Sequence, residues 1–261
     1  MMLGAIAGDI IGSIFESKNI KHADFEPLFQ INTTWTDDTV LTLATADLLT
    51  YGGTYADVYQ IYGCRYPFAG YGGSFFEWMK KENPAPYNSW GNGAGMRVSP
   101  IGWARDSVDE VLAEAERSAE VTHNHPEGIK GAKAIALAVY LARTGVSKEK
   151  IRREIEDRFE YNLSRTLDEI RPKYGFDVSC QGSVPEAIIA FLESTDFESA
   201  IRLAISIGGD SDTIACMAGS IAQAHYGKIP AAITDTCREK LHKRLLPVLD
   251  EFCEKYPDVD K

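Results

Sequence analysis

The stretch "GIKGAKAIALAVYLAR", residues 128–143, is the strongest indication of the fold class of this chain. Its apolar side chains cover nearly all sides of a helical wheel, which is typical of a helix buried at the centre of a protein. Further helical patterns occupy residues 39–49, 107–120, 146–161, 183–193, 195–207, 212–227 and 229–256. Alternating strand patterns are scarce, and no βαβ order appears. The sequence therefore predicts an all-α fold in which residues 1–261 form one domain.

Serine residues mark two of the predicted helix starts. Segments 107–120 and 183–193 each begin with serine and carry glutamate three positions later, which is the pattern of a capping box. Pro185 would then stand in the first turn, where its missing N–H costs nothing. The terminal segment 229–256 is expected to form one or two helices, broken near Pro247.

Composition and charge exclude several classes of protein. The 261 residues are 44% hydrophobic and 25% charged, with a net charge of −11, so nonspecific binding to nucleic acid is not expected. The apolar N-terminus lacks a basic region and is interrupted by Asp9, which argues against a signal peptide. No apolar run is long enough to cross a membrane. Five scattered cysteines without a CxxC pair favour free thiols over disulfides, so we expect a cytoplasmic protein.

The stretch "TWTDDTVLTLA", residues 34–44, places several oxygen ligands at the entrance of an apolar helix. Thr36, Asp37 and Asp38 offer a hydroxyl and two carboxylates, which are ligands that hard divalent cations prefer. Threonine and aspartate are also ordinary N-cap residues. Taken alone, this stretch favours a simple helix cap.

A second oxygen-rich cluster appears far along the chain, in "IGGDSDTIA" at residues 207–215. Asp210, Asp212 and Thr213 again stand at the start of an apolar helix, after two glycines that permit a tight bend. If the two helices pack side by side, their ligands converge between them. Four carboxylates and two hydroxyls fit a pair of Mg²⁺ or Mn²⁺ ions, so the two clusters together predict a two-metal site.

Two more segments add candidates to this site. In "GDIIGSIFE", residues 8–16, Asp9 is expected to be a buried hydrogen-bonding residue, and Glu16 is expected to end the helix as an extra ligand or gate. In 88–103, the glycines at 91, 93 and 95 can expose backbone N–H groups as a nest for a phosphate anion. Arg97 can pair with a phosphate or with an inner carboxylate.

Six motifs occur in the order GDxxGxxxE, TDDT, GNGxxMRxxPIG, THxHP, GGDxDT and YGxIP. In this order they resemble the ADP-ribosylglycohydrolase family, which includes hydrolases of ADP-ribosylarginine and ADP-ribosylserine. The resemblance covers about Gly4 to Pro230. It implies a single-domain orthogonal helical bundle, all-α, with a binuclear metal centre in a central cleft. It also implies two Mg²⁺ or Mn²⁺ ions as cofactors.

The resemblance assigns roles to individual positions of this sequence. The implied metal ligands are Thr36, Asp37, Asp38, Asp210, Asp212 and Thr213. The implied contacts to ADP-ribose are Ser89, Trp90, Gly91, Asn92, Gly93, Met96, His123 and His125. The implied catalytic residues are Asp210, Glu16 and Asp37.

The reaction that the resemblance implies is hydrolysis of the glycosidic bond between ADP-ribose and an acceptor, which reverses ADP-ribosylation. The acceptor is a protein side chain or a small molecule. Two alternatives stay open: a non-catalytic relative that binds ADP-ribose, and a hydrolase of another ribosyl nucleotide compound. A prenyltransferase site requires DDxxD, and Asp37 and Asp38 are not followed by the third aspartate. The sequence leaves the acceptor and the oligomeric state open.

Overall fold

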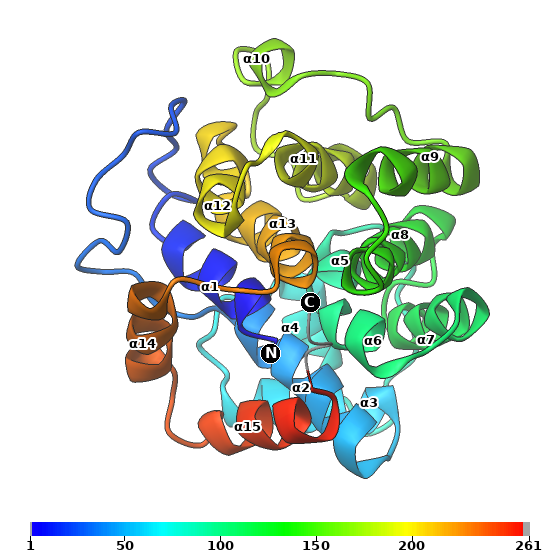
Figure 1. The fold of residues 1–261 in the computed structure, drawn as a ribbon. Helices are drawn as coiled ribbons and strands as arrows, with labels where there is room; N and C mark the ends of the chain where they lie inside the picture. The colour runs from blue at the N-terminus through cyan, green and yellow to red at the C-terminus, as the bar shows by residue number, and fades with distance from the viewer. Residues whose placement is uncertain (1, 258–261) are drawn as a thin grey trace.

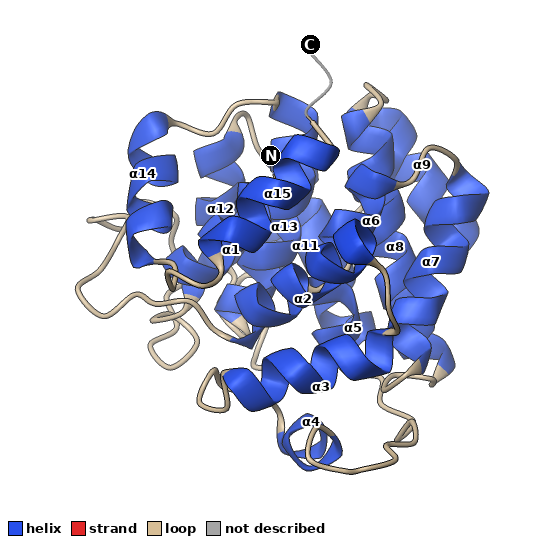
Figure 2. Ribbon diagram, turned by 90° about the horizontal axis from the view of Figure 1, so that it is seen from below, coloured by secondary structure: helices blue, strands red, loops and turns tan. Residues whose placement is uncertain are grey.

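The computed structural model describes residues 2–257, and over this range it confirms the all-α prediction (Figures 1 and 2). The helices are α1 Leu3–Gly12, α2 Asp37–Tyr51, α3 Tyr55–Arg65, α4 Gly73–Trp78, α5 Gly93–Met96, α6 Ser99–Ala104, α7 Val108–Glu120, α8 Pro126–Arg143, α9 Lys148–Phe159, α10 Leu167–Ile170, α11 Cys180–Glu193, α12 Phe197–Ser206, α13 Ser211–Tyr226, α14 Ala231–Lys240 and α15 Leu246–Lys255. The only bridge of strand type in this range is an isolated one between Gly91 and Ser179. No helix among these is both long and apolar enough to span a lipid bilayer.

Helix α13 lies at the centre of the bundle, where it contacts α1, α8, α11 and α12 (Figure 1). All of its residues from Ser211 to Ala224 are buried. The stretch at 128–143 forms most of α8, which packs against α5, α6, α7, α9, α11 and α13. Its alanines and leucines meet neighbours on nearly every side, so the prediction of a central helix at this position is confirmed.

Helices α1 and α13 touch through their backbones because α1 carries glycine at every fourth position. A Cβ atom on Gly4, Gly8 or Gly12 would lie 2.0–2.6 Å from a backbone atom of α13. The tightest case is Gly8, whose Cβ would lie 2.0 Å from the carbonyl oxygen of Ala215. Residues four apart share one face of a helix, so this glycine face lies directly against α13. The contact brings Asp9 of α1 beside the start of α13.

Helix α1 ends at Gly12, so the prediction that Glu16 ends this helix is wrong. Glu16 lies in the turns that follow, at the beginning of the long segment 13–36 that connects α1 to α2. The side-chain amide of Asn19 stabilises these turns by donating to the carbonyl oxygen of Glu16 at 2.9 Å. The side-chain oxygen of Asn19 accepts the N–H of Gly209 at 2.5 Å, which fixes the segment to the turn before α13.

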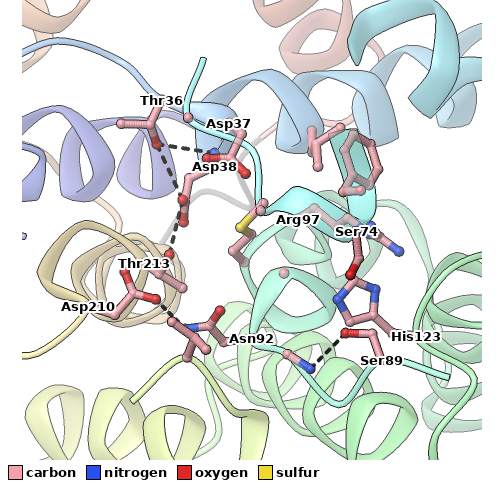
Figure 3. Close-up of a pocket in the computed structure, with 18 of the residues that line it drawn as sticks. Thr36, Asp37, Asp38, Ser74, Ser89, Asn92, Arg97, His123, Asp210 and Thr213 are labelled. Atoms are coloured by element: carbon pink, nitrogen blue, oxygen red, sulfur yellow. Dashed lines mark hydrogen bonds between the residues drawn. The ribbon is translucent and has the colours of Figure 1, made fainter. Parts of the chain in front are cut away.

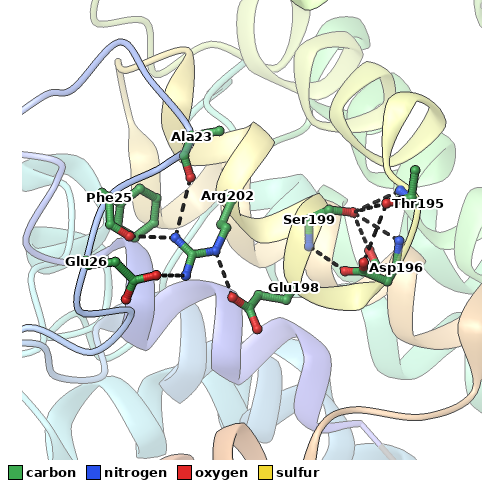
Figure 4. A network of polar contacts seen from close by, with 8 residues as sticks. All are labelled: Ala23, Phe25, Glu26, Thr195, Asp196, Glu198, Ser199 and Arg202. Atoms are coloured by element: carbon green, nitrogen blue, oxygen red, sulfur yellow. Dashed lines mark hydrogen bonds and ion pairs between the residues drawn. The ribbon is translucent and has the colours of Figure 1, made fainter.

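The middle of segment 13–36 is anchored to α12 by Arg202 (Figure 4). The guanidinium donates to the carbonyl oxygen of Phe25 at 2.6 Å and lies 4.9 Å from its ring centroid. It also pairs with Glu26 at 2.9 Å and with Glu198 at 2.8 Å. The segment that carries Glu16 is therefore held against the bundle although it contains no helix.

Helix α11 begins earlier than the capping box predicts. Ser179 is its N-cap and accepts the N–H of Gly182 at 3.1 Å, whereas the hydroxyl of Ser183 donates to the carbonyl oxygen of Ser179 at 2.7 Å. Pro185 consequently lies inside the helix and not in its first turn. The bridge between Ser179 and Gly91 is a tertiary contact that fixes this start, and the local pattern of the sequence does not contain it.

Two other predicted boundaries agree better with the structure. Ser107 caps α7 by accepting the N–H of Glu110 at 3.3 Å. The terminal segment 229–256, which was expected to form one or two helices, forms the two helices α14 and α15. Pro247 lies in the first turn of α15, just after the break, where a proline is tolerated.

Candidate metal centre and substrate cleft

The N-termini of α2 and α13 meet beside one cavity (Figure 3). Thr36 is the N-cap of α2, and its hydroxyl accepts the N–H of Asp38 at 3.3 Å. Asp210 occupies the N-cap position of α13. The hydroxyl of Thr213 donates to the carboxylate of Asp38 at 3.1 Å, so the two clusters are in direct contact. The structure thus brings together the two oxygen-rich segments that the sequence predicted to converge.

Asp9 is buried next to these helix starts and holds the first turn of α2. Its Oδ2 accepts the backbone N–H of Thr36 at 2.9 Å and that of Thr39 at 3.0 Å, and both threonine hydroxyls also donate to this carboxylate. These contacts confirm Asp9 as a buried hydrogen-bonding residue. Desolvation raises the pKa of Asp9 to about 6, while the hydrogen bonds favour its charged form and limit the rise.

The acidic side chains form two overlapping groups. One oxygen each of Asp9, Asp38 and Asp212 lie within 4.8 Å of one another, and so do oxygens of Glu16, Asp210 and Asp212. Burial, and then the charges of neighbouring carboxylates, raise the pKa values of Asp38 and Asp212 well above the usual value. The Oδ1 atom of Asp38 is buried and lacks a hydrogen-bond partner within the described residues. Buried carboxylate oxygens need a compensating charge, so this donor set fits a hard divalent cation.

The cation-free site should make the stability of the protein depend on pH. Burial, followed by the charge of Asp9, raises the pKa of Asp37 to about 8 from 3.8. The folded state therefore binds more protons than the unfolded chain between these values, and the free energy of unfolding falls as pH rises. We expect the melting temperature in EDTA to decrease from roughly pH 5 to pH 8.

Saturating Mg²⁺ or Mn²⁺ should reverse most of this loss, because a cation favours the charged carboxylates. The measurement is differential scanning calorimetry across pH, with and without cation. A melting temperature in EDTA that is constant or rises over this window would contradict the prediction.

The cavity encloses about 380 Å³. The acidic residues that line it are Glu16, Asp37, Asp38, Asp210 and Asp212, together with Thr36 and Thr213. The predicted substrate contacts that line it are Ser89, Gly91, Asn92, Gly93, Met96 and His123. The acidic cluster and the glycine-containing loop therefore face the same space.

Two predicted substrate contacts, Trp90 and His125, do not line this cavity. The side chain of Trp90 is half exposed and its ring packs against that of His125, with centroids 5.4 Å apart. The Nδ1 atom of His125 accepts the N–H of Glu127 at 3.1 Å, so this histidine caps α8. Both residues belong to the predicted motifs, but a motif alone does not fix whether a side chain lines the cavity.

The glycine-containing loop does not form the predicted anion nest from three glycine N–H groups. The N–H of Gly91 donates to the hydroxyl of Ser89 at 3.1 Å, and the N–H of Gly95 donates to the carbonyl oxygen of Asn92 at 2.7 Å. Two of the three donors are therefore already used. The loop is connected to the acidic cluster instead, because the side-chain amide of Asn92 donates to Asp210 at 2.7 Å (Figure 3).

One wall of the cavity lies in a loop-rich stretch, residues 63–103, whose composition is typical of a ligand-facing loop, but the sequence did not single out the residues of this wall. It consists of Gly70, Gly72, Gly73, Ser74 and Phe75, at and before the start of α4. The N–H of Asp37 donates to the carbonyl oxygen of Ala69 at 2.8 Å, which holds this wall against α2. The glycine-rich composition around these residues indicated a loop, but the sequence contains no signal that it reaches the first turn of α2.

The motif order, the helical fold and the acidic cluster point to one family, and comparison with known proteins agrees. The family model described as ADP-ribosylglycohydrolase matches residues 1–260. The chain belongs to the ADP-ribosylglycohydrolase family. It is 30% identical to the ADP-ribosylhydrolase ARH3 of Mus musculus, over 90% of this chain and 86% of that protein.

Two further comparisons place this ADP-ribosylglycohydrolase among related proteins. It is 26% identical to the ADP-ribosylarginine hydrolase Tri1 of Pseudomonas putida (strain GB-1), over 100% of this chain and 78% of that protein. A solved chain described as an ADP-ribosylglycohydrolase-related protein complex superimposes with a TM-score of 0.71 at 24% identity, covering 97% of this chain and 96% of that one. The last comparison shows that this chain and the solved chain have the same helical fold.

Proposed function

We propose that this glycohydrolase, which reverses ADP-ribosylation by cleaving a glycosidic bond, works with two Mg²⁺ or Mn²⁺ ions at the N-termini of α2 and α13. The proposed ligands are Thr36, Asp37, Asp38, Asp210, Asp212 and Thr213. The observation that carries the proposal is the cluster of buried carboxylates, one of them with an unpartnered oxygen, at the wall of a cavity. We treat residues 1–261 as one functional domain.

The two ends of the cavity carry different chemical groups, and this supports one orientation of the bound substrate. The acidic end suits the ribose next to the scissile bond, because bound cations attract hydroxyl oxygens. The other end presents Ser89, Asn92, Gly93 and His123, which suit the phosphates of ADP-ribose. Trp90 and His125 are not included, since they lie outside the cavity.

Divalent cations at this site would orient the bound ribose through its hydroxyl oxygens and make a nearby water easier to deprotonate. Side chains of the protein would transfer the protons of the reaction. Glu16 is exposed at the mouth of the cavity, and partial burial followed by the charge of Asp210 raises its pKa. We propose that Glu16 accepts a proton from the attacking water as the water oxygen bonds to the ribose carbon. The bond between the ribose carbon and the acceptor breaks, and the acceptor leaves with the bonding electron pair and takes up the proton that Glu16 received, so ADP-ribose and the free acceptor are the products.

Replacing Glu16 by glutamine should lower kcat by roughly 10²–10⁴-fold without unfolding the protein, because it removes only the proton-accepting group. The exposed position of Glu16 makes the change sterically neutral. The measurement is the rate of ADP-ribose release under single-turnover conditions, with the melting temperature as the control for folding. An unchanged kcat would remove Glu16 from the chemical step.

The function is tested with a set of defined substrates that carry ADP-ribose on arginine, on serine and on a small guanidine. The protein is first stripped of cations with EDTA and then assayed after addition of Mg²⁺ or Mn²⁺. We expect release of ADP-ribose from at least one substrate, only after a cation is restored. Equal release in EDTA would contradict the metal requirement, and release from none would contradict the assignment to these substrates.

We further propose that the protein acts in the cytoplasm on ADP-ribosylated proteins or small molecules, without a membrane or nucleic acid as general partner. The net charge of −11 disfavours nonspecific nucleic-acid binding. All five cysteines are free thiols, which is typical of a reducing compartment.

A further inference from the structure

Arg97 is a fully buried cation in the wall of the substrate cavity. Its Nη2 donates to the carbonyl oxygen of Ser118 at 2.7 Å and to the hydroxyl of Thr122 at 2.8 Å. The guanidinium carbon lies 4.2 Å from the ring centroid of Tyr59. Among the described residues it makes no ion pair, so of the two expected partners, a phosphate or an inner carboxylate, the carboxylate is not found here. One of these contacts, the hydroxyl of Thr122, connects Arg97 to His123.

The hydroxyl of Thr122 determines which nitrogen of His123 carries a hydrogen. Arg97 can only donate, so this hydroxyl accepts from it. The Thr122 side chain is fully buried, and within the described residues the only other hydrogen-bond partner of its hydroxyl is Nδ1 of His123, at 2.7 Å. The single hydroxyl hydrogen must therefore go to Nδ1, since otherwise a buried donor would be left without an acceptor. Nδ1 is then an acceptor, and the hydrogen of a neutral His123 lies on Nε2.

The Nε2 atom of His123 faces the loop that lines the cavity. A Cβ atom on Gly93 would lie 3.3 Å from it and one on Gly91 would lie 3.5 Å from it, so side chains there would cover this nitrogen. Nδ1 contacts Thr122, whereas Nε2 has no hydrogen-bond partner among the residues described. Figure 3 shows the ring of His123 next to Ser89 at this end of the cavity. The position leaves one N–H directed at a ligand.

We propose that Arg97 and Thr122 are positioning residues that hold His123 as a neutral donor, with Nε2–H binding a phosphate oxygen of the substrate. This inference rests on the proposed function. A phosphate oxygen near neutral pH only accepts hydrogen bonds, so an Nε2–H attracts it whereas an Nε2 lone pair would repel it. His123 thus binds the substrate and takes no part in proton transfer.

The charges around His123 are consistent with a permanently neutral ring. Burial, and then the charge of Arg97, hold the pKa of His123 well below its usual value. The ring of Tyr87 lies 5.9 Å from that of His123, and burial raises the pKa of the Tyr87 phenol to about 12, so this group is also neutral. No carboxylate contributes to the shift of His123.

The tautomer is tested on the full chain by ¹⁵N NMR of the histidine side chains, with the resonances of His123 assigned by their loss in His123→Phe. We expect hydrogen on Nε2 and none on Nδ1, unchanged from roughly pH 5 to pH 8. Hydrogen on Nδ1, or protonation of the ring within this window, would overturn the proposal. This measurement needs neither substrate nor cation, so it is independent of the proposed function.

The link to binding is tested by a double-mutant cycle, with calorimetric titration of ADP-ribose. Thr122→Val removes the hydroxyl at nearly constant volume and should weaken binding about tenfold, as should His123→Phe. Because Thr122 acts through His123, the double variant should bind no more weakly than His123→Phe. Thr122→Ser restores the hydroxyl and should recover most of the affinity.

Effects of Thr122→Val and His123→Phe that multiply in the double variant would overturn the positioning role. The contacted group is identified with adenosine, which has no phosphate. Its affinity should be the same for wild type and His123→Phe, and an equal loss with adenosine would overturn the assignment to phosphate. Failure of the wild type to bind ADP-ribose would count against the proposed function, whereas the NMR result would still decide the tautomer.

Discussion

Replacing Asp212 by asparagine is expected to lower kcat/KM by roughly a thousandfold and to abolish the response of the enzyme to added cation. Asp212 is the one residue that belongs to both acidic groups, so its loss weakens both proposed cation positions together. Asparagine has nearly the same shape but lacks the negative charge. The measurement is ADP-ribose release from the best substrate of the set, over a titration of Mg²⁺ and Mn²⁺.

The stability of the Asp212→Asn variant distinguishes a lost ligand from a damaged fold. Burial and neighbouring carboxylates raise the pKa of Asp212 well above its usual value, so the charged side chain destabilises the cation-free protein at high pH. In EDTA near pH 8, we expect the variant to melt at or above the temperature of the wild type. Cations should stabilise it less than they stabilise the wild type.

Asp157→Asn provides the matched control, because Asp157 is exposed on α9 and the change of charge is the same. Its activity and its cation response should equal those of the wild type. If Asp212→Asn retains cation-dependent turnover like this control, the proposed metal centre is wrong.

Gly8→Ala should lower the free energy of unfolding by about 2–3 kcal/mol or more, which is the largest loss of stability among these predictions. The new Cβ atom, which is fixed directly to the backbone of α1, would lie 2.0 Å from the backbone carbonyl oxygen of Ala215, so no side-chain rotation can relieve the overlap. Helices α1 and α13 would have to separate, which also shifts Asp9 away from Asp212. The measurement is denaturant unfolding in saturating cation, followed by the activity of the folded fraction.

Gly175→Ala serves as the control for this substitution. A Cβ atom at Gly175 would meet nothing within 4 Å, so the same chemical change should leave the free energy of unfolding nearly unchanged. Equal stabilities of Gly8→Ala and Gly175→Ala would show that α1 and α13 can repack, contrary to the contact described above.

The features that sequence predicted best are those encoded within single helices. The apolar stretch at 128–143 identifies α8, because a buried helix needs apolar side chains all round. The two oxygen-rich helix starts were also found, since each combines a cap position with an unusual number of ligands. The sequence predicted that these two helix starts meet only if the helices pack side by side. The hydrogen bond between Thr213 and Asp38 shows that they do meet.

Features that depend on contacts between distant loops were predicted less well. The start of α11 was misplaced because the bridge between Gly91 and Ser179 sets it. Trp90 belongs to the right motif, yet its side chain is half exposed and does not line the cavity, since the surroundings of a side chain in an irregular loop depend on the neighbouring structure. The individual residues of the wall at 70–75 were not identified for the same reason.

The glycine face of α1 also restricts which changes in chain length this protein tolerates. Each residue of a helix turns the chain by about 100°, so one residue inserted within α1 would rotate the following glycines away from α13 and replace them with side chains. It would also turn Asp9 away from Thr36 and Thr39, depending on which side of Asp9 it falls. The alignment with the mouse relative spans 318 positions although this chain has 261 residues, so that relative contains insertions. Insertions are compatible with the site in connections such as 13–36, whereas the length of α1 is fixed by the helix it touches.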